Sequence, residues 1–130
     1  MVKPPKSIPH KDHYQRISFL YQSSSLFANS EKYQVLSRAL ARNVDLVSKK
    51  TVLKLTPAMK RTICKKCHTN LIPGINMKIR IENLSKKQSE KSQVLVHQCN
   101  NCLESKRFPI GKNKDYKLFS EREDIAIDVD

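Results

Sequence analysis

Two Cys-x-x-Cys pairs constrain this sequence more than any other feature. They comprise all four cysteines of the 130-residue chain. A gap of two residues lets both sulfurs of one tight turn bind a single ion at about 2.3 Å, so two such turns complete a tetrahedron. The sequence therefore predicts a zinc ribbon with one structural zinc ion, whose ligands are Cys64, Cys67, Cys99 and Cys102.

Other uses of the four cysteines fit the sequence less well. Two disulfides are disfavoured in the intracellular context that we expect, and a thioredoxin-like redox site needs a βαβ unit, for which we find no pattern. Catalytic zinc needs an open coordination position, which four thiolates close. His68 and His97 lie beside the cysteines in the sequence and remain alternative ligands.

Hydrophobic periodicity indicates two helices in the first half of the chain. Apolar residues recur every three or four positions from Asp12, a candidate N-cap, to about Phe27, and again from Glu31 to about Lys50. Asn29 and Ser30 interrupt the pattern and offer a second cap. Two such helices predict an antiparallel hairpin. Either they pack on each other and on the rest of the chain, or a partner protein covers part of their apolar stripe, which comprises Tyr33, Leu36, Leu40, Val44 and Val47 on the second helix.

After Pro57 the hydrophobic period changes to two. Apolar residues alternate with polar ones over 75–81, as in a half-buried strand. Further strands are expected over 93–98 and 106–110, with a polar hairpin tip at 85–92. The predicted fold class is α+β, a helical hairpin followed by an antiparallel zinc ribbon. The predicted organisation is a basic arm (1–11), a two-helix region (12–56), the ribbon (57–112) and a tail (113–130) that ends in acidic residues.

The strongly positive charge predicts an anionic partner. The chain carries 25 Lys and Arg against 12 Asp and Glu, and residues 1–120 alone have a net charge of +17. Nucleic acid is the usual counterpart of such a body, and an anionic membrane surface is the alternative. No apolar run approaches the roughly 20 residues of a transmembrane helix, and we find neither a signal-peptide core nor a lipidation motif. We therefore expect nucleic acid and no membrane.

Six cations flank the cysteine pairs: Lys60, Arg61, Lys65, Lys66, Lys106 and Arg107. Some of this charge can balance the −2 of a zinc tetrathiolate, but six cations exceed that need, so we expect several to contact phosphates. Lys49 and Lys50 could extend this set of phosphate-binding cations. Few aromatic residues are available for base stacking, and Phe108 is the nearest. We therefore expect contacts to the backbone and shape of structured RNA rather than recognition of its base sequence. No catalytic set emerges, and we expect no enzymatic activity in the chain alone.

Several motifs together resemble one family. Residues 59–67 (MKRTICKKC) and 99–102, with the trailing stretch 105–108 (SKRF), resemble the two knuckles of the zinc-ribbon protein subunit of nuclear ribonuclease P. Residues 12–22 (DHYQRISFLYQ) resemble its first helix, and 40–42 with 45–50 resemble its second. Residues 116–123 are similar to the fungal members in particular. The long segment 78–93 departs from many members, and its role is open.

The resemblance implies a function that composition alone does not give. Members of this family are non-catalytic, RNA-binding subunits of a ribonucleoprotein whose RNA removes 5′ leaders from precursor tRNA. The implied partners are ribonuclease P RNA, the Sm-like barrel subunit, the other protein subunits and precursor tRNA, in the nucleus or nucleolus. The implied face for the Sm-like subunit comprises Tyr14, Ile17, Leu20, Tyr21, Leu36 and Leu40. The alternatives are the sister particle ribonuclease MRP and a zinc-ribbon module of the transcription or ribosome machinery.

Overall fold

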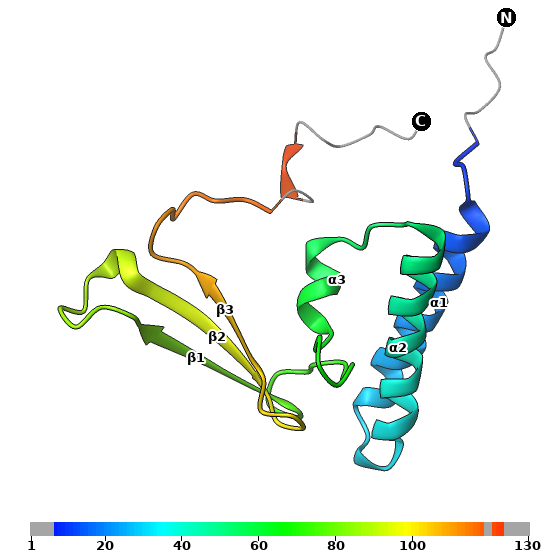
Figure 1. Cartoon of the computed structure of the whole chain (residues 1–130), viewed down its shortest axis with the longest axis horizontal. Helices are drawn as coiled ribbons and strands as arrows, with labels where there is room; N and C mark the ends of the chain where they lie inside the picture. Colours follow the sequence, from blue (N-terminus) through cyan, green and yellow to red (C-terminus); the bar gives the residue numbers. More distant parts are fainter. Residues whose placement is uncertain (1–6, 119–120, 124–130) are drawn as a thin grey trace, which may run out of the picture. The chain divides into compact units, whose positions relative to one another are not determined.

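The computed structural model describes residues 7–118 and 121–123, and the chain divides after Lys54 into two compact units. The first unit contains two long helices, and the second contains a short helix and a three-stranded antiparallel sheet (Figure 1). This confirms the predicted α+β class and order of elements. Residues 1–6 of the predicted basic arm and half of the predicted tail, 119–120 and 124–130, lie outside the described residues. Within the described ranges, no helix has the length and apolar character to cross a membrane.

The helical hairpin consists of α1 (Lys11–Ala28) and α2 (Gln34–Thr51), joined through a 3-10 turn, Glu31–Tyr33. The predicted N-cap of α1 was wrong: the cap is His10, whose carbonyl accepts the N–H groups of His13 and Tyr14 at 3.1 and 3.3 Å. Asp12 instead lies in the first turn, where its carboxylate faces the positive end of the helix dipole.

The connection between α1 and α2 is closed by side chains other than the predicted caps. Ser30 precedes the 3-10 turn, but its side chain makes no capping hydrogen bond, and Asn29 donates back to the carbonyl of Ser25. The amide of Gln34 donates to the carbonyls of Ala28 (2.7 Å) and Ser30 (3.2 Å). This amide therefore holds the backbone of the connection in place at the start of α2.

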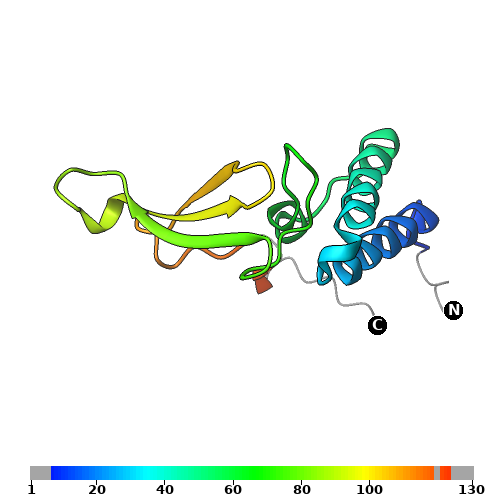
Figure 2. The same cartoon turned by 90° about the horizontal axis from the view of Figure 1, so that it is seen from below.

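Small side chains form the contact between α1 and α2. Ser24 and Ala28 of α1 and Ser37 and Ala41 of α2 are almost completely buried. The Ser24 hydroxyl donates to the carbonyl of Ser37 at 2.9 Å, and the Ser37 hydroxyl donates to the carbonyl of Ser24 at 2.8 Å. These reciprocal bonds satisfy both buried hydroxyls and let the two backbones approach closely, as Figure 2 shows for the adjacent helices.

The large apolar side chains of the hairpin are therefore not its main core. On α2 the buried positions are Ser37, Ala41, Val44 and Ser48, whereas Leu36 is 43% exposed. Within the predicted stripe Val44 is buried, whereas Leu36 and Tyr33 are exposed, which agrees with the alternative in which a partner protein covers part of the stripe. Apolar periodicity did not indicate the buried serines because it does not count serines that bond to a partner backbone. Phe19 and Leu26 of α1 and Val35 and Leu46 of α2 are at least half exposed as well.

Replacing Ser37 with leucine should weaken the hairpin. A larger side chain at this contact has no free volume to enter, and overpacking of this kind costs about 1–3 kcal/mol of unfolding free energy. Urea unfolding followed by the helical circular dichroism signal measures the effect. Ala39→Leu, at an exposed site on the same helix, is the matched control and should change the unfolding free energy little. Equal stability of the two variants would contradict the small-residue contact.

The sheet has the strand order β1 (Met77–Asn83), β2 (Gln93–Cys99) and β3 (Ser105–Pro109). Met77 pairs with Cys99 at one end of the β1–β2 hairpin, and Asn83 pairs with Gln93 at the other. The connection between them contains a 3-10 turn, Glu90–Ser92, so the polar tip lies at the end of the sheet away from the cysteines (Figure 2). The antiparallel ribbon is thus as predicted.

The most buried side chains of the sheet are not those of the strand that the alternation indicated. Ile79 and Ile81 of β1 are 47% and 64% exposed, whereas Val94 and Val96 of β2 are buried. Val96 pairs with Arg80, so it lies on the opposite face from the two isoleucines. Apolar alternation located this strand, but the prediction that its isoleucines are half-buried was wrong at Ile81. Ile81 shares its sheet face with Phe108 of β3, and the contacts of this face with α3 lie on β3, at Lys106 and Phe108.

A short helix, α3 (Pro57–Thr62), precedes the first cysteine pair and was not predicted. Its N-cap is Thr56, whose hydroxyl accepts the N–H of Met59 at 3.4 Å, and Pro57 occupies the first turn. Threonine followed by proline is a typical helix start. The signal was therefore present, but six residues are too few to show helical periodicity.

Candidate metal centre and basic groove

Two backbone turns of the same construction present the four cysteines. In each turn, the N–H of the first cysteine donates to the carbonyl five residues later, and its carbonyl accepts the N–H four residues later. Both turns therefore hold their first cysteine by two backbone bonds of 2.9–3.0 Å, as found for Cys64 with Thr69 and His68, and for Cys99 with Glu104 and Leu103.

The residue after the second cysteine of each turn has a left-handed backbone. His68 and Leu103 have φ values of 58° and 60°. This conformation costs side chains other than glycine roughly 1–2 kcal/mol. The chain adopts it twice at equivalent positions, which indicates that the turn geometry is imposed by the cysteines and their backbone bonds.

The four sulfurs form one cluster with the dimensions of a tetrathiolate site. Sγ of Cys64 lies 3.4 Å from Sγ of Cys102, and Sγ of Cys67 lies 3.6 Å from Sγ of Cys99. These separations are too long for a disulfide, about 2.05 Å, and close to the edge of about 3.8 Å of a tetrahedron with 2.3 Å zinc–sulfur bonds. All four ligand atoms lie within 4.8 Å of one another, so the donor set fits one soft divalent cation.

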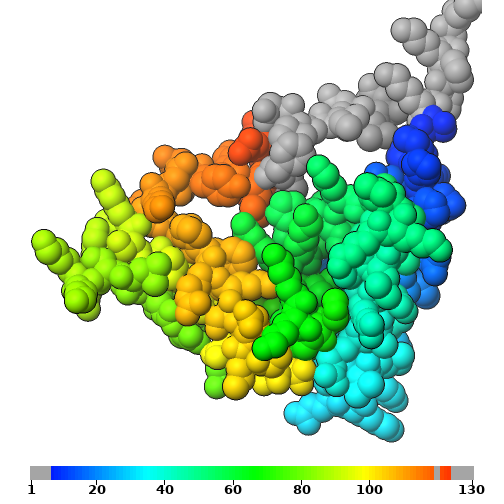
Figure 3. Space-filling model, viewed as in Figure 1, coloured from blue at the N-terminus to red at the C-terminus, as the bar shows by residue number. Residues whose placement is uncertain are grey.

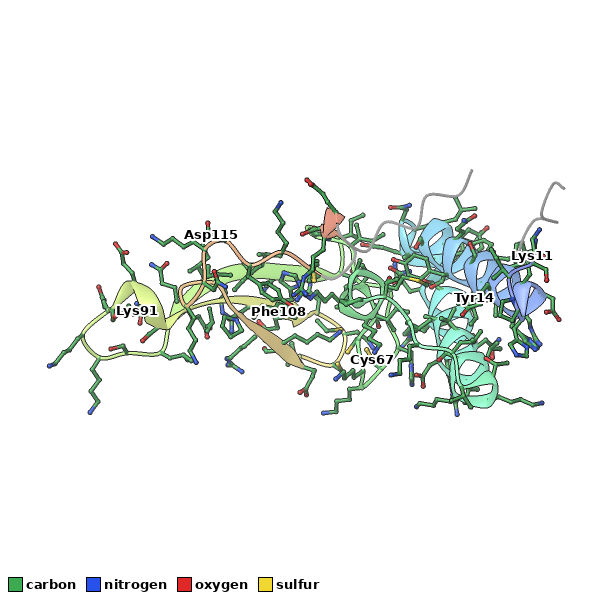
Figure 4. All side chains as sticks on the ribbon, turned by 90° about the horizontal axis from the view of Figure 1, so that it is seen from above. Lys11, Tyr14, Cys67, Lys91, Phe108 and Asp115 are labelled. Atoms are coloured by element: carbon green, nitrogen blue, oxygen red, sulfur yellow. The ribbon has the colours of Figure 1, made fainter. Side chains whose placement is uncertain are left out.

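The cluster consists of the cysteines alone among the described residues. Neither His68 nor His97 belongs to it, so the alternative histidine ligands have no support in the geometry. Figure 4 shows Cys67 in the turn that follows α3. Cys64, Cys99, Leu71 and Met77 are buried together, with Cys67 and Cys102 packed against them. The ligands thus make up most of this buried cluster.

Burial and hydrogen bonds separate the pKa values of the thiols. Burial raises the pKa of Cys67, but hydrogen bonds from Thr69, whose hydroxyl lies 2.9 Å away, and from Asn101 outweigh it and set the pKa to about 6. Burial raises the pKa of Cys102 to about 12 and also raises that of Cys99. Four thiolates cannot coexist here without a cation, so metal binding must release protons.

A basic groove lies between α3 and β3 beside the first cysteine turn. Figure 3 shows the atoms of α3 (green) directly beside those of β3 (orange). The groove has a volume of about 500 Å³. Most of its lining is basic or aromatic, and it comprises Pro57, Lys60, Arg61, Lys65, Glu104, Ser105, Lys106, Arg107 and Phe108.

Lys106 fastens α3 to β3. Its ammonium group donates to the carbonyls of Lys60, at 3.0 Å, and Ile63, at 2.5 Å. Both carbonyls lie at the C-terminal end of α3, where a cation also opposes the helix dipole. Burial lowers the pKa of Lys106, and the nearby charge of Lys65 adds to this effect. The sequence did not indicate this structural role, and contact of Lys106 with RNA stays a prediction.

An Arg–Phe–His stack lies along the same groove. The guanidinium carbon of Arg61 is 4.6 Å from the ring centroid of Phe108, within cation–π range. The His97 ring meets Phe108 edge-on at 5.0 Å. Nδ1 of His97 is buried with no hydrogen-bond partner among the described residues. Burial lowers the pKa of His97, and Lys106 and Arg61 lower it further.

The remaining predicted cations do not all share this groove. Arg107 also lines the groove, although it follows Lys106 on β3 and its Nε lies 3.7 Å from the carboxylate of Glu82 on the other sheet face. Lys66 is exposed in the first cysteine turn. Lys49 and Lys50 end α2 in the other unit, and Lys49 pairs with Asp45 at 2.7 Å.

The six residues of the implied partner face lie on α1 and α2. Tyr14, which Figure 4 labels on α1, is 48% exposed, and Leu36 is 43% exposed. Ile17 is only 5% exposed. Leu20, Tyr21 and Leu40 are half-buried. The face is therefore accessible mainly through Tyr14 and Leu36.

Removing the Lys106 ammonium should loosen α3 from the sheet. Lys106→Met keeps the aliphatic stem but leaves two carbonyls without their charged donor, and a hydrogen bond to a charged group contributes about 1.5–3 kcal/mol. Hydrogen exchange of the metal-loaded protein should show faster exchange in α3 and the first cysteine turn. Lys65→Met, at an exposed site in that turn, is the control. Unchanged exchange in Lys106→Met would contradict the anchoring role.

Comparisons with known proteins agree with this architecture. A model of the RNase P Rpr2/Rpp21/SNM1 subunit domain matches residues 16–103. Ribonuclease P protein subunit RPR2 of Saccharomyces cerevisiae is 36% identical over 129 residues, which cover 95% of this chain and 82% of the relative. Ribonuclease P protein subunit rpr2 of Schizosaccharomyces pombe is 39% identical over 102 residues, 78% of this chain and 94% of the relative.

Two solved structures have a similar fold. A chain of an archaeal ribonuclease P with mature tRNA has a TM-score of 0.70 at 24% identity, with 88% of each chain covered. A structure described as Pfu Rpp21 has a TM-score of 0.53 at 29% identity, covering 73% of this chain and 96% of that chain. The helical hairpin followed by a three-stranded ribbon is thus a known fold.

Proposed function

Because the chain belongs to the RNase P Rpr2/Rpp21/SNM1 subunit family, we propose that it is an RNA-binding protein subunit of ribonuclease P that supports removal of 5′ leaders from precursor tRNA. The observation that carries this proposal is the 36% identity to a ribonuclease P subunit across 95% of the chain. The match spans both units, so it includes the hairpin, the cysteine turns and the groove.

We propose that the metal is one structural zinc ion held by Cys64, Cys67, Cys99 and Cys102. The sulfur separations and the all-thiolate donor set support zinc over harder cations. When bound, the ion supplies a cross-link between the two turns and no open coordination position. The residues around the ion position the neighbouring elements. The two turns hold α3 and β3, and Lys106 joins these two elements.

We propose that RNA binds the second unit through its cations, Lys60, Arg61 and Lys65 above all. These residues line or flank one groove, and among its lining residues Glu104 is the only acidic one. A rigid set of cations neutralises phosphates and releases counterions without sequence selection. Such contacts would stabilise the folded RNA and the bound precursor. Further candidates are Arg107, which also lines the groove, and Lys66, Lys49 and Lys50, which are not among its lining residues.

We propose that the exposed apolar side chains of the hairpin contact another protein subunit, for which the family resemblance names the Sm-like barrel subunit. Phe19 and Leu26 are each 69% exposed, and Tyr14 and Leu36 are each more than 40% exposed. So many large exposed apolar groups on two adjacent helices are typical of an interaction surface. Of the two interpretations left open by the sequence, this exposure favours a partner protein over packing within the chain.

The chain itself is proposed to be non-catalytic and to act in the nucleus or nucleolus, while the RNA subunit hydrolyses the phosphodiester bond. The thiols at the metal site close the ligand shell, so this site offers no position for an attacking water. Incubating the purified chain with precursor tRNA should give no cleavage. Cleavage without added RNA subunit would contradict the non-catalytic role.

Affinity purification of the tagged chain tests the proposed assembly. We expect enrichment of ribonuclease P RNA together with activity that removes 5′ leaders. Recovery of ribonuclease MRP RNA alone would favour the sister particle, and recovery of polymerase or ribosomal subunits without either RNA would favour a zinc-ribbon module of another machinery. A Cys99→Ser variant should recover less RNA if the ribbon carries the contact.

A further inference from the structure

The groove between α3 and β3 contains a flat cationic and aromatic surface. The guanidinium of Arg61 lies over the ring of Phe108 at 4.6 Å, and both residues are only partly buried. Both also line the groove, together with the cations Lys60 and Lys65. A planar cation over an aromatic ring is a surface on which a further planar group can stack.

The pair is held in place before any ligand binds. Lys106 fastens the end of α3, and with it Arg61, to β3 through two carbonyl hydrogen bonds. The rings of His97 and Phe108 meet edge to face with 5.0 Å between their centroids, so His97 restricts the orientation of Phe108 from the neighbouring strand. A ligand that stacks on the pair therefore loses little free energy to ordering these side chains.

We propose that the Arg61–Phe108 pair is a stacking site for one unpaired nucleotide of bound RNA. This inference rests on the proposed RNA-binding function and deepens it. Arginine planes and aromatic rings are the surfaces on which proteins stack splayed-out bases. Lys60 and Lys65 are then placed for the flanking phosphates. A paired base in a duplex has both faces covered by its neighbours, so it cannot occupy this site.

The size and charge of the groove agree with a nucleotide. Its volume of about 500 Å³ falls within the range of about 300–1,000 Å³ in which proteins bind small organic ligands. Three or more cations against one carboxylate, Glu104, favour an anionic ligand. The aromatic ring favours a planar one, and a nucleotide is both. Because few aromatic residues lie near the cysteines, we expect a single stacked base at this site. Base contact is therefore limited in number but not absent.

Two variants separate stacking from charge. Arg61→Lys keeps the positive charge and loses the planar group, and Phe108→Leu keeps an apolar side chain beside His97. Fluorescence anisotropy with full-length, metal-loaded protein compares a short labelled single-stranded RNA with a blunt duplex of the same sequence. We expect each variant to weaken single-strand binding by about 5- to 150-fold. Duplex affinity and the salt dependence of binding should change little.

Lys65→Gln is the matched control, since it removes charge from the same groove and should weaken both RNAs. Metal content verifies that each variant is folded, and if Phe108→Leu fails to bind metal, Arg61→Lys decides. Single-strand affinity unchanged by Arg61→Lys would overturn the stacking site while leaving the proposed function intact. Failure of the unmodified protein to bind either RNA would count against both.

Ultraviolet crosslinking in the assembled particle identifies the source of the nucleotide. We expect the peptide containing Phe108 to crosslink to an unpaired position, and mapping that position with and without precursor tRNA assigns it to the RNA subunit or to the tRNA. Either source supports the stacking site. A crosslink confined to paired positions, or none from this peptide, would overturn it.

Discussion

Removing the metal from the native protein should unfold the sheet of the second unit while α1 and α2 keep most of their helical structure. The buried cluster of that unit consists of Leu71, Met77 and the four ligands. Without the ion, the ligands become thiols that no longer connect the two turns. Structural zinc contributes about 10–16 kcal/mol in small zinc peptides, as much as the whole net stability of a domain, about 5–15 kcal/mol.

Hydrogen exchange with and without a chelator measures this effect segment by segment. Amides of β2 should lose their protection, whereas those of α1 and α2 keep theirs, because the contact between the helices through Ser24 and Ser37 uses no cysteine. Cys99→Ser should reproduce the result without chelator. Ser105→Ala, on β3 and outside the cluster, is the matched control. Persistent protection of β2 after verified metal removal would show that the sheet does not depend on the ion.

Affinity for ribonuclease P RNA should fall steeply with salt. If four to six phosphates are contacted, the slope of log affinity against log salt should be about −4 to −5, a loss of about 300- to 1,000-fold between 50 and 200 mM salt. The groove supplies Lys60, Arg61 and Lys65 to such contacts. Filter binding or anisotropy across a salt series measures the slope.

A single charge change tests where the contacts lie. Lys60→Gln should reduce the slope by about one, since one neutralised phosphate is lost. Lys32→Gln, at an exposed position between α1 and α2, removes the same charge outside the predicted RNA-binding set and should leave the slope unchanged. An affinity of the unmodified protein that does not change with salt would refute binding through phosphate contacts. Equal slopes for both variants would show that these contacts lie outside the groove.

The cysteine spacing and the two hydrophobic periods predicted the order of elements and the clustering of the four cysteines. These features are local: each Cys-x-x-Cys pair fits one turn, and each period reflects one kind of element. The faces of the elements are set by packing between distant residues, which a period does not report. Ser24 and Ser37 are buried because each bonds to the other helix. Ile81 is exposed on β1 because the contacts of its sheet face with α3 lie two strands away, on β3.

The groove was predicted only as a set of cations. Lys106 and Arg107 are adjacent in the sequence, yet β3 directs them to opposite faces of the sheet. Lys106 fastens α3, Arg107 pairs with Glu82, and Arg61 lies over Phe108. These contacts join residues more than twenty positions apart. A count of charges near the cysteines cannot distinguish a structural lysine from an exposed one.

X-ray absorption at the zinc edge of the natively purified protein is the most direct measurement of the metal centre. The arrangement of the sulfurs of Cys64, Cys67, Cys99 and Cys102 predicts one zinc ion per chain with four sulfur neighbours at about 2.3 Å. A shell that contains nitrogen or oxygen, or protein that is folded and active without stoichiometric zinc, would contradict the account.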